Sequence, residues 1–268
     1  MILGQGLERD PAVQARVVLA LAARGLRVQL RRAQFLMPAF VLPLALLAIV
    51  AGGTSSVTAL RGFPDTGAFI GFIIAGTIVQ GTLFAGLTGG IALAADIEGG
   101  FFDRLMTAPV ARVSLVLGRI AGAAVLGVAQ VIVFLAVALL FGARYQGGAA
   151  GVIEVAGLAA CTAGAVCAVA CAIALLTGSM QLMQNLFPLM FVLLFTAPAF
   201  FPRDFLAPAM GAVAPFNPLT YIVEGMRAAL HADPALGSPL HGLLAALAFL
   251  VAATVFAVLA MRRRVAAA

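Results

Sequence analysis

The chain has 268 residues, of which 63% are hydrophobic and only 10% are charged. Soluble domains carry about 25% charged residues, so this composition excludes an ordinary soluble protein and indicates an integral membrane protein. All 16 basic residues are arginines and the net charge is +6, but the long apolar runs leave no solvent-facing basic domain of the kind that binds nucleic acid.

The segment 1–32 is predicted to lie in the cytoplasm and to contain a basic amphipathic helix. Asp10 and Pro11 suit its N-cap and first turn, and Gly25 is a candidate end. A helix of this kind lies on a membrane surface. At 100° per residue, five arginines fall within an arc of about 80°, and these are Arg9, Arg16, Arg24, Arg27 and Arg31. The alternative is a secretory signal peptide with its apolar core at 17–23.

Six apolar runs are predicted to cross the membrane, for which a helix needs about 20 residues. Turn residues and amides at 177–185 divide one long run into the fourth and fifth spans. Residues 262–268 form a tail. With six spans, twelve arginines lie on the side of the termini and four on the other, so the positive-inside rule places both termini in the cytoplasm. The predicted spans are 33–51, 66–95, 113–143, 151–177, 182–201 and 240–261.

A densely charged segment, 95–112, connects the second and third runs. As a helix over 97–109 it is amphipathic, with Ile97, Phe101 and Leu105 on one face. A solvated loop with an aromatic membrane anchor explains this pattern. A docking element explains it equally well, because an aromatic anchor fills a pocket in a partner protein and charges set the register.

The segment 202–239 contains six prolines and is too polar in places for a span. Asn217 and Pro218 form a good helix start, but the helix that follows reaches only about 20 Å, less than the ~30 Å hydrocarbon core. We therefore expect a re-entrant element, which is tolerated only when it is buried in protein or lines an aqueous cavity. Glu224 and Arg227 are three residues apart, which suggests either a local ion pair or a gating role.

Two of the runs carry side chains that suit an apolar pathway. Walls rich in phenylalanine and methionine with a few amides favour a hydrophobic or amphipathic cargo. The same stripes also fit simple packing against neighbouring helices. The candidate residues are Thr77, Gln80 and Phe84 in the second run, and Gln184, Phe187, Met190, Phe191 and Phe195 in the fifth.

Two blocks of sequence resemble the type-2 ABC exporter permeases, especially the daunorubicin-resistance-like subfamily. They are "IEGGFFDRLMTAPVARVSLVLGR", residues 97–119, and "FNPLTYIVEGMRAAL", residues 216–230. The resemblance implies an all-α, six-span permease whose loop after the second span is a coupling helix that docks on a separate ATPase. It also implies that the second and fifth spans line a cavity across a dimer, and that the segment before the last span forms an outer gate.

The resemblance assigns roles to particular residues. The implied ATPase-docking residues are Glu98, Gly99, Phe101, Arg104 and Leu105. The implied outer-gate residues are Asn217, Glu224 and Arg227. The implied cargo is a drug, natural product or lipid-like molecule, moved out across a bacterial cytoplasmic membrane by two permease copies, with a homodimer preferred over a heterodimer.

The chain is expected to be a transport subunit rather than an enzyme. A phosphate-binding P-loop needs a lysine after its glycine-rich turn, and this chain has none. We therefore expect ATP and Mg²⁺ to be used by the partner ATPase, and no cofactor or metal to be bound by this chain. The alternatives are an ATP-independent channel or secondary carrier and, third, a membrane-embedded enzyme.

Overall fold

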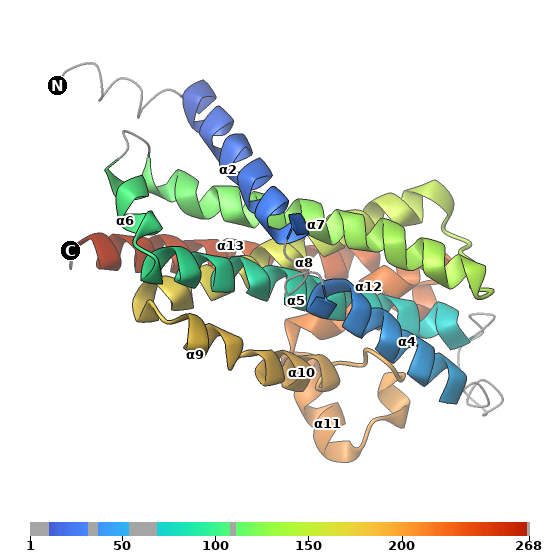
Figure 1. Cartoon of the computed structure of the whole chain (residues 1–268). Coiled ribbons are helices and arrows are strands. Elements are labelled where there is room, and N and C mark those ends of the chain that lie inside the picture. Colours follow the sequence, from blue (N-terminus) through green and yellow to red (C-terminus); the bar gives the residue numbers. More distant parts are fainter. Residues whose placement is uncertain (1–10, 32–36, 54–68, 108–110, 267–268) are drawn as a thin grey trace.

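The computed structural model describes residues 11–31, 37–53, 69–107 and 111–266, and the regular elements in these ranges are all helices. Four of them are long and apolar enough to cross a membrane. The shortest of the four has 28 residues and reaches about 42 Å at 1.5 Å per residue, which exceeds the ~30 Å thickness of the hydrocarbon core of a membrane. Figure 1 shows them running side by side. They are α5 (Phe69–Glu98), α7 (Arg112–Leu140), α8 (Gly148–Thr177) and α13 (Pro239–Ala266).

Helix α5 is the centre of the bundle and is almost completely buried. Its glycines let α8 approach closely, as expected where small residues line helix contacts in a membrane. A Cβ atom added at Gly86 would lie 2.6 Å from Cβ of Val166 and 2.8 Å from the carbonyl oxygen of Ala163. One turn further on, a Cβ at Gly90 would lie 2.4 Å from Cβ of Ala170. The two backbones are therefore packed without room for a methyl group.

The first predicted span is divided in the structure into a π-helical turn, η1 (Met37–Val41), and α4 (Leu42–Gly53). The twelve residues of α4 reach about 18 Å. Gln130 of α7 supports the turn, since its Nε2 donates to the carbonyl oxygens of Ala39, at 2.7 Å, and Gly81, at 3.1 Å. No local pattern in the sequence indicates this contact, which joins η1, α5 and α7 inside the bundle.

The fifth predicted span is also interrupted. Helices α9 (Met180–Gln184) and α10 (Phe187–Phe195) are separated by a turn. Pro188 has no N–H to donate to the carbonyl of Gln184, so a continuous helix would lose a hydrogen bond there. The helix expected over 182–201 in fact ends at Phe195, ahead of a non-helical turn that contains Pro198.

Between α10 and α13 the chain forms a group of short helices, the longest of which is inserted into the bundle. Asn217 caps α12 as predicted, with its Oδ1 accepting from the N–H of Leu219 at 2.9 Å. Helix α12 packs against α13, α8 and α5, so most of its residues are buried. The elements are η3 (Arg203–Phe205), α11 (Pro208–Val213), η4 (Ala214–Phe216), α12 (Pro218–His231) and η5 (Pro234–Leu236).

The predicted N-terminal helix is present as α2 (Pro11–Arg31), and it continues through Gly25, so the expectation that Gly25 ends it is wrong. Its apolar side rests on α7, where a Cβ at Gly118 would lie 2.6 Å from Cβ of Leu21. The expected N-cap, Asp10, lies outside the described residues. The position of α2 on a membrane surface stays a prediction. Four of its arginines are exposed, namely Arg16, Arg24, Arg27 and Arg31.

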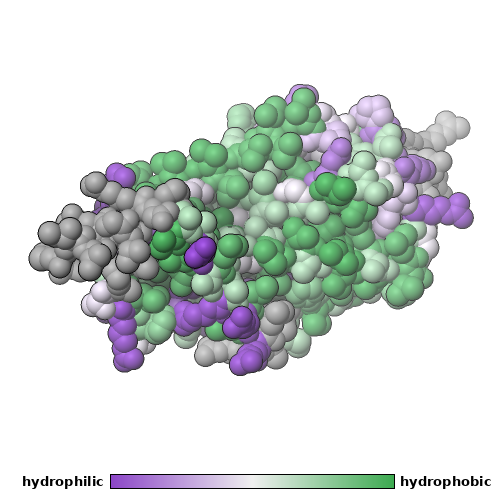
Figure 2. Space-filling model, turned by 90° about the horizontal axis from the view of Figure 1, so that it is seen from above, coloured by the Kyte–Doolittle hydropathy of each residue, from purple (hydrophilic) through white to green (hydrophobic). Residues whose placement is uncertain are grey.

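The surface matches the helix arrangement. Figure 2 shows apolar side chains over the middle of the molecule and most of the hydrophilic ones toward its two ends. One end carries a short helix, α6 (Phe101–Met106), together with the last turns of α8 and α13. We call it the α6 end.

We expect Gly86→Val to disrupt the contact between α5 and α8. The new side chain would meet Val166 and the backbone of Ala163 inside van der Waals distance, and overpacking of this kind destabilises by about 1–3 kcal/mol or more. Gly157→Val is the matched control, because a Cβ at Gly157 has nothing within 4 Å. Thermal unfolding in detergent should show a clear loss of stability for the first variant alone, and equal losses would contradict this account of the core.

Candidate functional sites

The charged segment after α5 forms a tight turn and a short helix rather than one helix over 97–109. Helix α5 runs to Glu98, and Gly100 then takes a left-handed conformation with φ of 70°. A residue without a side chain adopts this conformation freely. The expected helix start at Ile97 is therefore wrong, since α6 begins at Phe101. The helix is also shorter than expected at its other end, because α6 ends at Met106, and Pro109 itself lies outside the described residues.

The predicted docking residues do not form one uniform surface. Glu98, Gly99 and Arg104 are exposed, whereas Phe101 and Leu105 are partly buried. Glu98 is also engaged within the chain, because its Oε1 accepts a hydrogen bond of 2.7 Å from the N–H of Met180. This contact caps the first residue of α9, so the end of α5 is joined to the start of the α9–α10 pair.

The two phenylalanines of α6 fasten it to neighbouring helices. Phe101 lies under the guanidinium of Arg24 in α2, 4.1 Å from the ring centre. Phe102 is buried and lies beneath Arg264 of α13 at 5.6 Å. Cation–π contacts contribute about 0.5–1 kcal/mol at exposed sites. Helix α6 is therefore held between α2 and α13.

A cluster of charges lies beside this turn. Asp96 of α5 forms an ion pair and hydrogen bond with Arg119 of α7, and its carboxylate lies 4.0 Å from Arg24. Arg119 interrupts the start of the third apolar run, and the sequence suggested no partner for it. The cluster ties α2, α5 and α7 together at the α6 end.

The aromatic residues predicted for the pathway come together within one chain, whereas the resemblance implied that the two spans face each other across a dimer. They lie along a contact between α5 and α10 that we call the α5–α10 seam. The ring of Phe84 lies 5.5 Å from that of Phe187 and 5.3 Å from that of Phe191. Phe191 stacks in turn on Phe195 at 6.3 Å. Met190 is buried and Gln184 is exposed. The seam is packed shut in this structure.

The polar residues of the seam are buried rather than exposed to a cavity. Thr77 donates to the carbonyl of Ile73 in its own helix at 3.2 Å. Gln80 is 1% exposed, and neither atom of its amide has a hydrogen-bond partner among the described residues. It lies one turn from Phe84 on the same face of α5. An unpaired buried polar group costs about 1–3 kcal/mol, so the closed seam leaves this amide unsatisfied.

The far end of the seam is closed by the turn at 197–200, which is buried against α5. A Cβ at Gly76 would lie 2.3 Å from the carbonyl oxygen of Ala199. Arg227 of α12 is 2% exposed and holds this turn in place. Its Nη2 donates to the carbonyls of Pro198 and Ala199, at 3.0 and 3.1 Å, and its Nε donates to that of Phe72 in α5, at 3.1 Å. Arg227 thus joins three segments through backbone atoms.

The suggested ion pair between Glu224 and Arg227 does not form. Glu224 instead accepts two hydrogen bonds from Arg203, at 2.5 and 2.8 Å, and this contact raises the pKa of Arg203. Arg227 points inward, where backbone carbonyls are available to it. The predicted pair is wrong because each charge finds a partner far away in the sequence.

Asn217 does more than cap α12. Its Nδ2 donates to the carbonyl of Leu193 at 2.7 Å and to Oγ1 of Thr196 at 2.9 Å. The amide therefore joins the end of α10 to the start of α12. All three predicted gate residues lie around the segment that follows α10.

A helical bundle with four helices of membrane-spanning length and apolar composition is the architecture of a multi-pass membrane protein. Residues 16–231 match the ABC-2 type transporter family, and the chain belongs to this family. It is accordingly a membrane transport subunit of the ABC transporter class, and membership of the family implies an ABC ATPase partner.

Two named relatives are transport proteins. The chain is 28% identical over 199 residues to the "Putative transport permease ycf38" of Porphyra purpurea, covering 74% of this chain and 68% of the relative. It is 27% identical over 198 residues to the protein of the same name from Pyropia yezoensis, again covering 74% and 68% of the two chains.

We expect a double-mutant cycle to separate the observed ion pair from the rejected one. Arg203→Ala and Glu224→Ala should show a coupling energy of about 0.5–1 kcal/mol in denaturant unfolding in micelles, because the pair is bidentate but partly exposed. The cycle of Glu224→Ala with Arg227→Ala should give a smaller coupling. The reverse order would show that Glu224 and Arg227 pair in solution.

Proposed function

We propose that the chain is the permease subunit of an ABC exporter of the daunorubicin-resistance-like subfamily, with six membrane spans. The four long helices supply four of them, and η1 with α4 and α9 with α10 supply the other two. The subunit resides in a bacterial cytoplasmic membrane with both termini in the cytoplasm. The arginines of α6 and of the last turns of α13 support this orientation, because they lie at the α6 end, where Arg24 of α2 also contacts Phe101.

The observation that carries the proposal is the hydrogen bond from Met180 to Glu98. It joins the end of α5, next to the proposed docking helix, to α9, which leads directly into the wall of the seam. An ATPase that pushes on α6 would therefore act on both sides of the seam. A loop that served only as a connector would have no need of this link.

The ATPase would dock on α6 and the turn before it, using Glu98, Gly99, Phe101, Arg104 and Leu105. The exposed Arg104 and Gly99 offer the most accessible surface, whereas Phe101 positions α6 through Arg24. ATP and Mg²⁺ would be bound and used by the ATPase. A second copy of the permease would complete the transporter, as a homodimer.

The cargo would pass along the α5–α10 seam once it opens. Phe84, Phe187, Phe191 and Phe195 would offer an apolar wall, and Thr77, Gln80, Gln184 and Met190 would add polar or adaptable contacts. This combination suits a hydrophobic or amphipathic drug, natural product or lipid-like molecule. The unsatisfied amide of Gln80 supports the pathway over simple packing, because a permanently closed contact gains nothing from burying it.

The turn at 197–200 would act as the outer gate. Arg227 holds it against α5, Asn217 joins the end of α10, directly before the turn, to α12, and Glu224 anchors the following segment through Arg203. Release of the cargo would require these contacts to break together. Because several contacts would have to break, the gate would stay closed until the cargo occupies the seam.

The first test is retention of the ATPase. We expect ATPase activity to co-purify with the parent subunit and to fall at least tenfold for Arg104→Glu, because charge reversal places a repulsive group in the docking surface. Arg144→Glu is the control, since Arg144 is exposed at the opposite end of the bundle. If no ATPase accompanies even the parent in mild detergent, the channel or carrier alternative is favoured instead.

The second test separates a pathway from packing at Gln80. We expect Gln80→Leu to raise stability by about 1–3 kcal/mol, because it removes an unsatisfied amide at similar volume, and to lower export of a hydrophobic dye. The control Gln130→Leu should lower stability, because it removes hydrogen bonds to Ala39 and Gly81. A Gln80→Leu protein that is more stable and exports normally would remove Gln80 from the pathway.

A further inference from the structure

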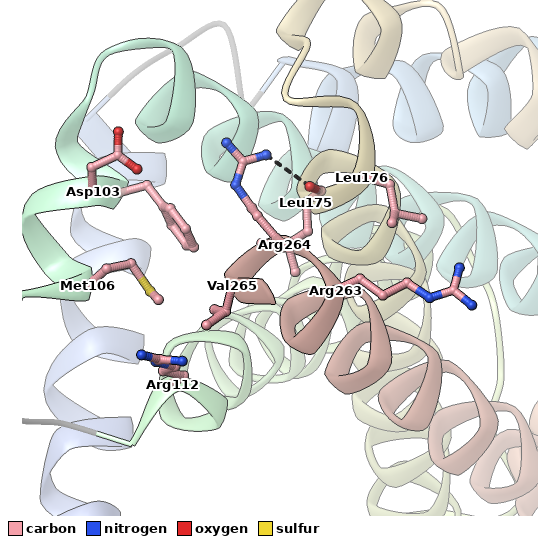
Figure 3. A pocket seen from close by; sticks show the side chains of 9 residues that line it. Asp103, Met106, Arg112, Leu175, Leu176, Arg263, Arg264 and Val265 are labelled. Carbon is pink, nitrogen blue, oxygen red and sulfur yellow. Dashed lines mark hydrogen bonds between the residues drawn. The ribbon is translucent and has the colours of Figure 1, made fainter. Parts of the chain in front are cut away.

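A hollow of about 730 Å³ opens at the α6 end. It is formed by α6, the first residue of α7, the last turns of α8 and the last turns of α13 (Figure 3). Its lining is partly basic and partly apolar. The lining residues are Phe102, Asp103, Met106, Arg112, Leu175, Leu176, Arg263, Arg264 and Val265.

Positive charge dominates this basic hollow, which has three arginines and one carboxylate. Arg264 is held in place, with Nη1 donating to the carbonyl of Leu175 at 2.9 Å and the guanidinium over Phe102. The guanidinium groups of Arg112 and Arg263 make no hydrogen bond or ion pair with the residues that the structure describes. Two of the three cations are therefore available to an anion.

The basic hollow is continuous with the apolar outer surface of the bundle. Figure 3 shows Asp103, Met106 and Arg112 on one side of Arg264, with Arg263 and Leu176 toward the other. Leu176 is 48% exposed. Leu259 lies one turn before Arg263 in α13 and is 50% exposed, so it extends this apolar surface toward the middle of the bundle.

We propose that the basic hollow binds the headgroup of an anionic phospholipid, whose acyl chains lie beside Leu176 and Leu259. Arginine matches the geometry of phosphate oxygens and binds them through charge-assisted hydrogen bonds. Basic pockets between membrane helices at the cytoplasmic side recognise anionic headgroups in this way.

The position of the site favours a lipid over an acidic segment of a partner protein. The arginines lie at the ends of membrane-length helices, where lipid headgroups are found, and exposed leucines lead from them along the bundle. An acidic protein loop would match the charge but would leave those leucines uncovered. A phospholipid matches both parts of the surface, because its headgroup pairs with the arginines and its acyl chains cover the leucines. This inference requires only that the bundle spans a membrane, and it stands apart from the proposed export function.

The experiment is native mass spectrometry of the purified full chain in detergent with added dioleoyl phosphatidylglycerol or dioleoyl phosphatidylcholine. We expect the parent to retain the anionic lipid and to lose the zwitterionic one. Arg112→Ala with Arg263→Ala should weaken retention about thirty-fold, because each arginine near a membrane surface contributes roughly a factor of five. Arg262→Ala is the matched control, since Arg262 is an exposed neighbour that does not line the hollow.

Further arms identify the ligand and guard against misfolding. Arg112→Lys with Arg263→Lys should retain most of the binding, because it preserves the charges. An equal loss for Arg262→Ala, or equal retention of the two lipids, would overturn the proposal. Displacement of the lipid by inorganic phosphate at matched ionic strength would assign the hollow to a soluble anion. Lipid bound to the isolated subunit but absent from its complex with a co-purified ATPase would assign it to a protein contact.

Discussion

The close packing of α5 against its neighbours is the constraint on which the rest of the structure depends. In a membrane, helices gain little from burying apolar surface, because lipid chains are equally apolar, and association depends on close contact between small residues. Gly86 and Gly90 bring the backbone of α8 into such contact, and Gly76 does the same for the turn at 197–200. Because α5 is surrounded on all sides, each of these contacts fixes another element of the bundle.

The same helix carries features of both candidate sites. At one end, Asp96 and Glu98 hold α7, α2 and α9 around the turn that leads into α6. In the middle, Gln80 and Phe84 face the α5–α10 seam. At the other end, the carbonyl oxygen of Phe72 accepts a hydrogen bond from the buried Arg227. One continuous helix therefore connects the two candidate sites, with polar contacts at both ends and an unsatisfied amide between them.

The sequence predicted the features that depend on local pattern. Charge and hydropathy indicated a membrane bundle, arginine periodicity predicted α2, and the residue pair before Leu219 predicted the start of α12. Helical spacing also placed Phe84 on one stripe, and Phe187 and Phe191 on another. The contact between these two stripes within one chain was not predicted, because the resemblance implied that they face each other across a dimer.

The sequence-based predictions failed where the partner of a residue is distant in the sequence. Glu224 was matched with Arg227, three residues away, whereas its partner is Arg203, and nothing in the local pattern of Gln130 or Arg119 indicates the helices that they contact. The predictions also missed backbone details, such as the left-handed turn at Gly100 and the end of α10 before Pro198.

The closed seam has a consequence for the assembly of the protein in a cell. Both of its walls, α5 and α10, belong to one chain, and so do the turn that closes it and the arginine that holds that turn. The contacts that close the seam therefore all form within one chain and need no other subunit. If the seam is the proposed pathway, a newly inserted copy would be sealed against ions before its partners arrive, and a cell could make it in excess without dissipating the gradients across its membrane.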